Sequence, residues 1–388
     1  MLIIAEAMVG GIRRHVLQIV RHADRDRFDL TLLCSVSRDP SFEPELDDLR
    51  AGGLAVIQEP MARSIRPLRD FRNYRRILRN LMARPYDVVH THGSKAGMLG
   101  RYAAHRYCLQ REHGCYVVHT GHTFPIQWAT GLEGRFYRAL EQRAASWTDR
   151  IIALTQAQKR MLIERKVCEP GKITVLPNAV ELPPLPSIQQ RLEARGKLGL
   201  PPDAPVAAMV GRIVEQKHPL LFAQTAAAAM RRRPELHFVW LGDGPLRHAM
   251  EREAQRLGVP PSHLLVTGQR SDVPGLLAAF DILLMTTRFE GMPYAALEAM
   301  AAALPVVAVD VPGMAELVQH GVTGCLAPPD AEKLAAEVLA LADNAARRQA
   351  FGQAARDLVN QRFLLKDFIN NLQDLYLSGS ESRGRKNP

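Results

Sequence analysis

Two apolar runs of strand length lie close together in the second half of the chain, and a single helix-forming stretch separates them. The runs are residues 281–287 (DILLMTT) and 306–311 (VVAVDV), and such runs are typical of strands buried in a parallel sheet. Between them, the residues from Tyr294 to Leu304 are Ala, Leu and Met apart from Tyr294 and Glu298. Because a helix without a polar face is buried, this β-α-β unit must lie inside an α/β domain.

Two glutamates, Glu290 and Glu298, lie eight positions apart around the start of this helix. Pro293 suits the first helical position because its missing N–H would have no helical partner there, so Glu290 would lie at the positive end of the helix dipole. Ligands of open α/β sheets bind beyond the carboxyl ends of the strands. Two interpretations fit: a ligand site, or Glu290 as a helix cap with Glu298 paired to a core arginine.

The length of the chain bounds the number of domains. With 388 residues it exceeds one ordinary core, so we expect two domains. The first half alternates strand-like and helix-like segments from LIIAEA to ITVLPNA, which predicts a second doubly wound parallel sheet. No apolar run reaches the length of a membrane span, and we expect no signal peptide. Five scattered cysteines without CxxC spacing indicate reduced thiols and a cytoplasmic location.

The positive charge is concentrated in the first half of the chain. Residues 1–182 contain 28 Lys and Arg against 19 Asp and Glu, whereas residues 183–388 contain 22 against 21. This asymmetry predicts an anionic partner, and the two candidates are phospholipid and nucleic acid. Because aromatic and basic residues do not interleave as they do in nucleic-acid-binding proteins, we expect no nucleic acid.

Two parallel stripes mark a predicted helix in this basic half. An apolar stripe follows 3-4-3 spacing, and an arginine stripe follows the same spacing one residue later. Such a helix either lies on a membrane surface or packs on the sheet with a solvated basic face. The apolar stripe comprises Leu68, Phe71, Tyr74, Leu78 and Leu81, and the arginine stripe comprises Arg69, Arg72, Arg76 and Arg79.

Histidines alternate at the ends of two predicted strands, in YDVVHTH and YVVHTGH. A pair such as His90 and His92 suggests a metal site, but no third ligand follows at a usable spacing. We therefore expect no metal there. A strand-end histidine is otherwise either a satisfied core residue or part of a ligand site.

The residues around the two glutamates resemble the signature of the family-4 retaining glycosyltransferases, which have the GT-B fold. The matching letters are RFEGMPYAALEAM, then ALPVV, then VPGMAELVQHGVTG, and the resemblance extends over almost the full chain. It implies an α/β protein with two facing Rossmann-like, doubly wound parallel-sheet domains. It also implies that Glu290 binds the donor sugar and Glu298 the ribose of a sugar nucleotide, with Gly291, Met292 and Pro293 at the helix start also on the donor.

Cations follow the first strand of the second domain in VAAMVGRIVEQKHP. Arg212 and Lys217 alone would be commonplace, but VGRxxxxK resembles the phosphate-clamping element of the family, with His218 where the family has glycine. The resemblance implies that Arg212 and Lys217 neutralise the diphosphate and that Arg270 faces the base. Since no DxD element stands at a strand end of the first domain, we expect no cofactor and no metal requirement.

Elements of the first half also match this family. GGIRRHV resembles its amino-terminal glycine loop, which places Gly11 beside the donor phosphates; a tight turn is the alternative. The missing GxGxxG argues against a dinucleotide oxidoreductase, and the shortened leading strand predicts an earlier start of the chain. The resemblance further implies that His122 reaches the donor sugar and that His92, Ser94 and Lys95 line the acceptor side.

Prolines mark the expected boundary between the domains. Five of them lie within residues 183–203, which predicts a linker. The first domain is expected over residues 1–182 and the second over 204–360. A helix at about 361–377 is expected to complete the first domain, and residues 378–388 are expected to be disordered.

These features predict a retaining hexosyltransferase. It would move a sugar from a nucleotide sugar, with uridine as the expected base, to a lipid-linked or saccharide acceptor in the synthesis of cell-surface polysaccharide or glycolipid. It would lie in the cytoplasm, peripheral on the inner face of the membrane. The alternatives are a sugar-nucleotide 2-epimerase of the same fold and a non-catalytic membrane-binding scaffold. The first would need further carboxylates in the first domain, and the second would not require both glutamates and both cations.

Overall fold

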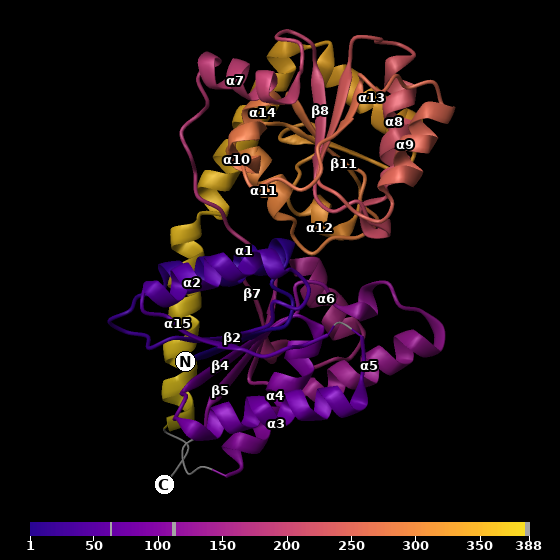
Figure 1. Cartoon of the computed structure of the whole chain (residues 1–388). Coiled ribbons are helices and arrows are strands. Elements are labelled where there is room, and N and C mark those ends of the chain that lie inside the picture. The colour runs from indigo at the N-terminus through magenta and orange to yellow at the C-terminus, as the bar shows by residue number, and fades with distance from the viewer. Residues whose placement is uncertain (63, 111–113, 385–388) are drawn as a thin grey trace. The chain divides into compact units, whose positions relative to one another are not determined.

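The computed structural model of the chain describes residues 1–62, 64–110 and 114–384. They form two compact units: unit 1 comprises Met1–Asn178 and Lys366–Pro388, and unit 2 comprises Ala179–Leu365. Each unit contains one parallel β-sheet with helices on both faces (Figure 1). The predicted class, an α/β protein with two Rossmann-like parallel sheets, is confirmed.

The sheet of unit 1 has seven described strands in the order β3-β2-β1-β4-β5-β6-β7, and all neighbours are parallel. Because the strand order reverses between β1 and β4, this pair is the topological switch point, where open α/β sheets bind ligands. The strands are β1 (Leu2–Ala5), β2 (Thr31–Cys34), β3 (Ala55–Gln58), β4 (Val88–His92), β5 (Tyr116–Thr120), β6 (Arg150–Ala153) and β7 (Ile173–Val175).

Helices cover both faces of this sheet, with α1 and α2 on one side and α3, α4 and α5 on the other (Figure 1). The core on the α3 and α4 side joins Leu2 and Val89 of the strands to Ile77, Leu81 and Ala103 of the helices. The helices are α1 (Gly10–His22), α2 (Glu43–Ala51), α3 (Pro67–Ala83), α4 (Ser94–Cys108), α5 (Gly131–Ala145), α6 (Gln156–Glu164) and α15 (Leu365–Gly384), with 3-10 turns η1 (Pro40–Phe42), η2 (Pro125–Gln127) and η3 (Pro170–Lys172).

The predicted striped helix is α3, but its buried face differs from the predicted apolar stripe. Asn73, Ile77 and Leu81 are buried, whereas Leu68 and Phe71 are 79% and 58% exposed. The buried residues recur every four positions, so they form one line along the helix that faces the core of unit 1. The first two turns of α3 therefore present apolar side chains to solvent.

The sheet of unit 2 has six described strands in the order β10-β9-β8-β11-β12-β13, and all neighbours are parallel. Its switch point lies between β8 and β11, which corresponds to the β1 and β4 pair of unit 1. The strands are β8 (Val206–Val210), β9 (His237–Leu241), β10 (Leu264–Val266), β11 (Ile282–Met285), β12 (Val306–Val309) and β13 (Gly324–Ala327).

The helices of unit 2 form two layers around this sheet. Helix α8 packs against α9 and α13, and α11 packs against α14. The helices are α7 (Ile188–Leu198), α8 (Pro219–Met230), α9 (Arg247–Arg256), α10 (Val273–Leu276), α11 (Tyr294–Ala301), α12 (Pro312–Ala315), α13 (Ala331–Ala342) and α14 (Ala345–Arg362), with 3-10 turns η4 (Glu215–Lys217) and η5 (Leu277–Ala279).

The central helix α11 is buried as predicted but is shorter than predicted. Pro293 is its N-cap residue with extended backbone (φ −76°, ψ 126°), not its first helical residue. The helix ends at Ala301 because Ala303 adopts left-handed backbone (φ 58°) and the amide of Leu304 donates to the carbonyl of Ala299. This is the usual geometry by which a helix terminates.

The predicted linker over residues 183–203 is wrong in one respect, because it contains helix α7. Ser187 begins this helix with a capping box that pairs its side chain with Gln190. Arg191 and Arg195 of α7 each donate to Asp281 at 2.8 Å, and Nη1 of Arg195 donates to three carbonyls of the loop that follows α7. The prolines therefore flank helix α7, and its two arginines bind α7 to the rest of unit 2 through Asp281.

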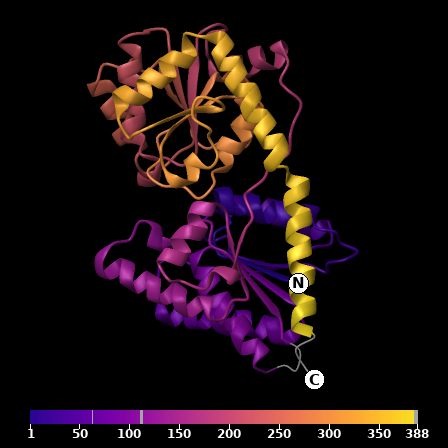
Figure 2. The same ribbon diagram turned by 180° about the vertical axis from the view of Figure 1, so that it is seen from behind.

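The expected disordered tail is also wrong over most of its length. A single helix, α15, continues to Gly384, while residues 385–388 lie outside the described residues. Gly379 lies so close to the ring of Tyr116 that a Cβ there would be 2.2 Å from it, and Arg383 pairs with Asp149. These contacts with unit 1 order the polar end of α15, which Figure 2 shows as the last long yellow helix.

The buried pair of Arg195 and Asp281 generates a prediction about stability. Arg195 is 1% exposed, and its removal leaves three loop carbonyls without their donor, although Asp281 would keep Arg191. We expect Arg195→Met to lower the free energy of unfolding by about 2–3 kcal/mol, the cost of buried polar groups that lose their partner. Chemical denaturation of the full chain, followed by far-UV circular dichroism, measures this.

Arg191→Met is the matched control for this measurement. Its side chain is 33% exposed and Asp281 would keep Arg195, so a loss of only about 1 kcal/mol is expected. Equal losses in the two variants would contradict the role assigned to Arg195.

Candidate functional site

Polar residues gather at the switch point of each sheet, where loops from non-consecutive strands meet. In unit 2 the loops after β8 and β11 contribute Lys217 and Glu290, and in unit 1 the segments after β1, β4 and β5 contribute histidines. The two sets differ in chemistry. The set of unit 2 is an ion pair, and the set of unit 1 consists of imidazoles.

The centre of the unit 2 site is the pair of Lys217 and Glu290. The Nζ of Lys217 lies 2.5 Å from Oε1 of Glu290, and the hydroxyl of Thr287 lies 2.9 Å from the same oxygen. Glu290 is 9% exposed, and the side chain of Lys217 is 15% exposed. A carboxylate in this position needs such partners because an unpaired buried charge is costly.

Backbone contacts hold the two loops of this pair together. The amide of Arg288 donates to the carbonyl of Gln216 at 2.8 Å, and the hydroxyl of Thr286 donates to the carbonyl of Lys217 at 2.8 Å. The side-chain amide of Gln216 donates to the carbonyl of Phe289 at 3.0 Å. The loop after β8 is thus fixed to the loop after β11, which holds Lys217 against Glu290.

His218 departs from the family pattern, which has glycine directly after the lysine. It adopts left-handed backbone (φ 51°, ψ 58°), a conformation that glycine adopts without steric cost. The family resemblance places glycine at this position, and this chain adopts the left-handed backbone there with a less suited residue. Left-handed backbone outside glycine is uncommon and recurs at functional sites.

Two glycines let other segments approach these loops closely. A Cβ on Gly313 would lie 2.3 Å from the carbonyl oxygen of Gly291, and a Cβ on Gly242 would lie 2.0 Å from that of Gly211. No side chain fits at either position. Gly313 therefore brings the start of α12 against the Glu290 loop, and Gly242 brings the end of β9 against the end of β8.

The other predicted residues of unit 2 differ in their exposure and in their contacts. Arg212 is exposed directly after β8, and Glu298 is half-buried on α11. Gly291 and Met292 are buried immediately before α11. Arg270 forms a two-pronged pair with Asp272 of its own loop, at 2.8 and 2.7 Å. The structure thus joins Lys217 to Glu290 directly, whereas Arg270 is engaged locally.

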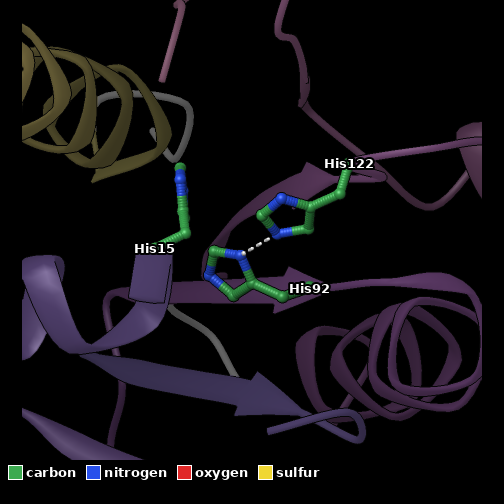
Figure 3. A group of neighbouring side chains, drawn as sticks. All are labelled: His15, His92 and His122. Carbon is green, nitrogen blue, oxygen red and sulfur yellow. Dashed lines mark hydrogen bonds between the residues drawn. The ribbon is translucent and has the colours of Figure 1, made fainter. Parts of the chain in front are cut away.

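The unit 1 site is a cluster of buried imidazoles, drawn in Figure 3. His15 comes from α1, His92 from the end of β4, and His122 from the loop after β5. Nδ1 of His92 lies 3.3 Å from Nε2 of His122, and Nδ1 of His15 lies 3.0 Å from Oδ1 of Asn178. The rings of His15 and His122 meet edge to face, with centroids 4.8 Å apart.

Burial keeps these imidazoles neutral. It lowers the pKa of His15 to about 4, and it lowers the pKa values of His92 and His122 well below the ordinary value, with further lowering by neighbouring histidines. His90 behaves in the same way, and its two nitrogens contact Tyr376 at 2.6 Å and Thr120 at 2.9 Å. The cluster therefore offers hydrogen bonds and nitrogen lone pairs without net charge.

The backbone of His122 is held in an uncommon conformation. Its φ is 58°, and the side-chain amide of Gln158 donates to its carbonyl at 2.8 Å. Gln158 is 2% exposed and also accepts from the amide of Leu154 at 2.8 Å. A buried glutamine thus fixes the loop that points the His122 ring toward His92 (Figure 3).

The other predicted residues of unit 1 lie around the same edge of the sheet. Gly11 is exposed in the first turn of α1, and Ser94 is exposed at the first position of α4. Lys95 pairs with Asp70 of α3 at 2.7 Å and donates to the carbonyl of Ser64 at 2.5 Å. The structure therefore brings His92 and His122 together but ties Lys95 to α3.

No sequence spacing indicated a third histidine beside His92, but the fold supplies one, while the expected absence of a metal stays a prediction. One nitrogen each from His15, His92 and His122 lies within 4.8 Å of the other two. The third imidazole comes from α1, 77 positions before His92, where no spacing motif could indicate it. The sequence indicates only that His15 is buried, because it shares the helical face of Ile12 and Ile19 at 3-4 spacing.

Solved structures that resemble the chain define the class of its fold. HepE from Anabaena in complex with UDP and glucose has a TM-score of 0.81 at 20% identity, covering 97% of this chain and 100% of that chain. WaaG, a glycosyltransferase involved in lipopolysaccharide biosynthesis, has a TM-score of 0.75 at 19% identity, covering 97% and 99%. At these identities the likeness shows the fold alone, and the fold is GT-B.

Sequence comparisons give the family. Residues 9–182 match the model "Glycosyltransferase Family 4", and residues 204–344 match "Glycosyl transferases group 1". The Escherichia coli UDP-Gal:alpha-D-GlcNAc-diphosphoundecaprenol alpha-1,3-galactosyltransferase is 32% identical over 323 residues, covering 82% of this chain and 81% of the relative. A D-inositol 3-phosphate glycosyltransferase of Kineococcus radiotolerans is 31% identical over 304 residues, covering 70% and 67%. The chain therefore belongs to the family-4 retaining glycosyltransferases.

The family confirms two predictions made from the sequence. The chain is a glycosyltransferase, as the motifs around Glu290 and Glu298 indicated, and its fold is GT-B. Both matching family models and both relatives named above are glycosyltransferases. Among the described residues, no helix has both the length and the apolar composition needed to cross a membrane.

The neutral imidazoles generate a prediction about pH. Because burial lowers their pKa values, the unfolded chain binds more protons than the folded chain once the pH falls below about 6.5. Stability should therefore fall between about pH 6.5 and pH 4, by about 1.4 kcal/mol per pH unit for each such histidine. Denaturation at a series of pH values, in buffer containing EDTA, measures this slope.

Burial also lowers the pKa of His119 well below the ordinary value. His119→Gln should therefore reduce the slope by about 1.4 kcal/mol per pH unit, the contribution of one proton. Gln255→Ala, at an exposed position of α9, is the control and should leave the slope unchanged because neither side chain titrates. A slope that is flat from pH 7 to pH 5 in the unchanged chain would contradict the neutral cluster.

Proposed function

We propose that the protein transfers a hexose, with retention of configuration, from a UDP-sugar to a lipid-linked acceptor. The observation that supports this best is the pair of Lys217 and Glu290 at the switch point of unit 2, directly before the amino-terminal end of α11. A sugar nucleotide needs cationic groups at its diphosphate and acceptors at its hydroxyls. The two loops hold one of each, at the sheet edge where ligands of such folds bind.

Each residue of this site has a role in the proposal. Lys217 has three N–H donors and uses one of them on Glu290, so the others can reach diphosphate oxygens together with Arg212. Glu290 accepts from hydroxyls of the donor sugar, and Glu298 accepts from the ribose. Backbone amides from Gly291 to Pro293 would add donors at the helix start.

The family resemblance adds residues of unit 1 to this assignment. His122 contacts the donor sugar, and Gly11 lies beside the donor phosphates. A neutral imidazole can donate or accept a hydrogen bond to a hydroxyl without attracting the diphosphate. Transfer needs no metal in this proposal, because Arg212, Lys217 and the amino-terminal end of α11 take the place of a cation at the leaving diphosphate.

The acceptor class rests on a relative and on the surface of α3. The Escherichia coli relative is named for a diphosphoundecaprenol-linked acceptor. In this chain the start of α3 exposes Leu68 and Phe71, and the arginine stripe lies beside them. Exposed apolar side chains with flanking arginines fit the surface of an anionic membrane. We propose that unit 1 docks there from the cytoplasmic side, which brings the enzyme to a lipid-linked acceptor.

The donor site is tested by nucleotide binding. We expect Glu298→Gln and Arg212→Ala each to weaken UDP binding by about 1–3 kcal/mol, the cost of a lost charged hydrogen bond. Isothermal titration calorimetry measures this, with Glu253→Gln on α9 as the control because Glu253 pairs with Arg256 of its own helix. Unchanged affinity in both site variants would show that the nucleotide binds elsewhere.

Membrane docking is tested by sedimentation with anionic liposomes. Each arginine near an anionic surface contributes about 1 kcal/mol, so changing Arg69, Arg72, Arg76 and Arg79 to Gln should abolish sedimentation while UDP binding persists. The attraction should weaken as salt shortens the screening length to about 3 Å near 1 M. If the unchanged chain ignores such liposomes at low salt, the stripe is only a solvated face.

The control for docking removes the same charge from unit 2. Arg231, Arg232, Arg252 and Arg256 are exposed at the ends of α8 and along α9, and changing all four to Gln gives an equal change in net charge. Sedimentation should then persist. Equal loss in both variants would indicate attraction by total charge, without a docking surface.

A further inference from the structure

We propose that His15, His92 and His122 form a binding site for a divalent transition metal of the zinc type. The inference goes beyond the transferase reaction, for which the family resemblance implies contacts of His122 with the donor sugar and of His92 with the acceptor, and no metal. It rests on the convergence of three imidazoles from α1, β4 and the loop after β5 (Figure 3).

The distances fit coordination after a small adjustment. One nitrogen from each ring lies within 4.8 Å of the other two, and two ring nitrogens of the set, on His92 and His122, are 3.3 Å apart. Two ligands bound to one tetrahedral Zn²⁺ at 2.0–2.1 Å lie about 3.4 Å apart. That pair is therefore already at the required separation, and His15 would have to move by at most about 1.5 Å, as follows from the same bond length.

The chemistry of the donors also fits. Imidazole nitrogen suits Zn²⁺, Cu²⁺ and Co²⁺, whereas Mg²⁺ and Ca²⁺ prefer oxygen. All three rings are buried, so no bulk water competes for their nitrogens. Three protein ligands leave a fourth position of Zn²⁺ open.

The surroundings orient the rings as outer contacts do in metal sites. Oδ1 of Asn178 accepts from Nδ1 of His15, which leaves Nε2 of His15 as the nitrogen with a lone pair. Gln158 fixes the backbone of His122. His92 is fully buried, and its Nδ1 is the nitrogen that faces the ring of His122.

Neighbouring histidines do not compete for this role. Both nitrogens of His90 are engaged, with Tyr376 and Thr120. Nδ1 of His119 contacts Thr91 at 2.9 Å, and its ring lies against Gly97. The ligand set is therefore the three histidines at the edge of the sheet.

A bound metal would have a consequence for transfer if the proposed function holds. It would occupy the ring of His122, so Zn²⁺ should inhibit the transferase and a chelator should restore turnover. Because transfer needs no metal in the proposed function, activity should persist in excess chelator. Loss of activity in chelator, restored by Mg²⁺ or Mn²⁺, would contradict that function. It would not contradict the proposed zinc site.

The site is tested by direct metal binding to the full chain after treatment with chelator. Titration with Zn²⁺, followed by calorimetry, should show one site, and Co²⁺ should give the visible absorption of tetrahedral cobalt. His15→Gln and His122→Gln should each weaken binding by at least about 100-fold. Asn178→Ala should weaken it about 10–100-fold, the usual effect of an outer contact.

The control is His263→Gln, because His237 and His263 stack with centroids 4.4 Å apart and offer another pair of imidazoles. This variant should bind Zn²⁺ like the unchanged chain. Circular dichroism checks that each variant folds, and if one ligand variant does not fold, the other and Asn178→Ala still decide. Absence of stoichiometric binding, or binding that survives in both ligand variants, would overturn the proposal.

Discussion

The order of the strands is the constraint on which both candidate sites depend. In each sheet the first strand of the unit lies beside the fourth, so the loops after these strands meet although the chain between them is long. Lys217 and Glu290 are 73 positions apart and share a hydrogen bond. In unit 1 the same arrangement brings α1, which follows β1, to the ends of β4 and β5. A parallel sheet with a reversal in strand order creates such a meeting point whatever residues occupy it.

The two units place different kinds of polar group where these loops meet. Unit 2 places a lysine and a glutamate there and fixes their loops by hydrogen bonds to backbone carbonyls, so the two charges are held in one orientation. A buried pair of this kind contributes little net stability, and its value lies in geometry. Unit 1 instead holds imidazoles that burial keeps neutral, which suit hydroxyls and metal ions.

Most of the architecture could be predicted from the sequence, because strand-length apolar runs and helical periodicity are local properties. The errors lie where tertiary contacts override local composition. Prolines around residues 183–203 suggested a linker, but Asp281 binds two arginines of α7 there. The polar residues after 377 suggested disorder, but Gly379 and Arg383 contact unit 1. Neither partner is close in the sequence.

The sequence by itself determined the family and the GT-B fold class, because these are carried by contiguous letters around Glu290 and by the spacing from Arg212 to Lys217. Only the tertiary structure decided that Lys217 pairs with Glu290, that Arg270 pairs with Asp272, and that His15 joins His92 and His122. The physical reason is that strand order and helix packing, which set these distances, depend on contacts between residues far apart in the chain. No residue near His15 in the sequence indicates that its ring lies beside that of His92, which is 77 positions away.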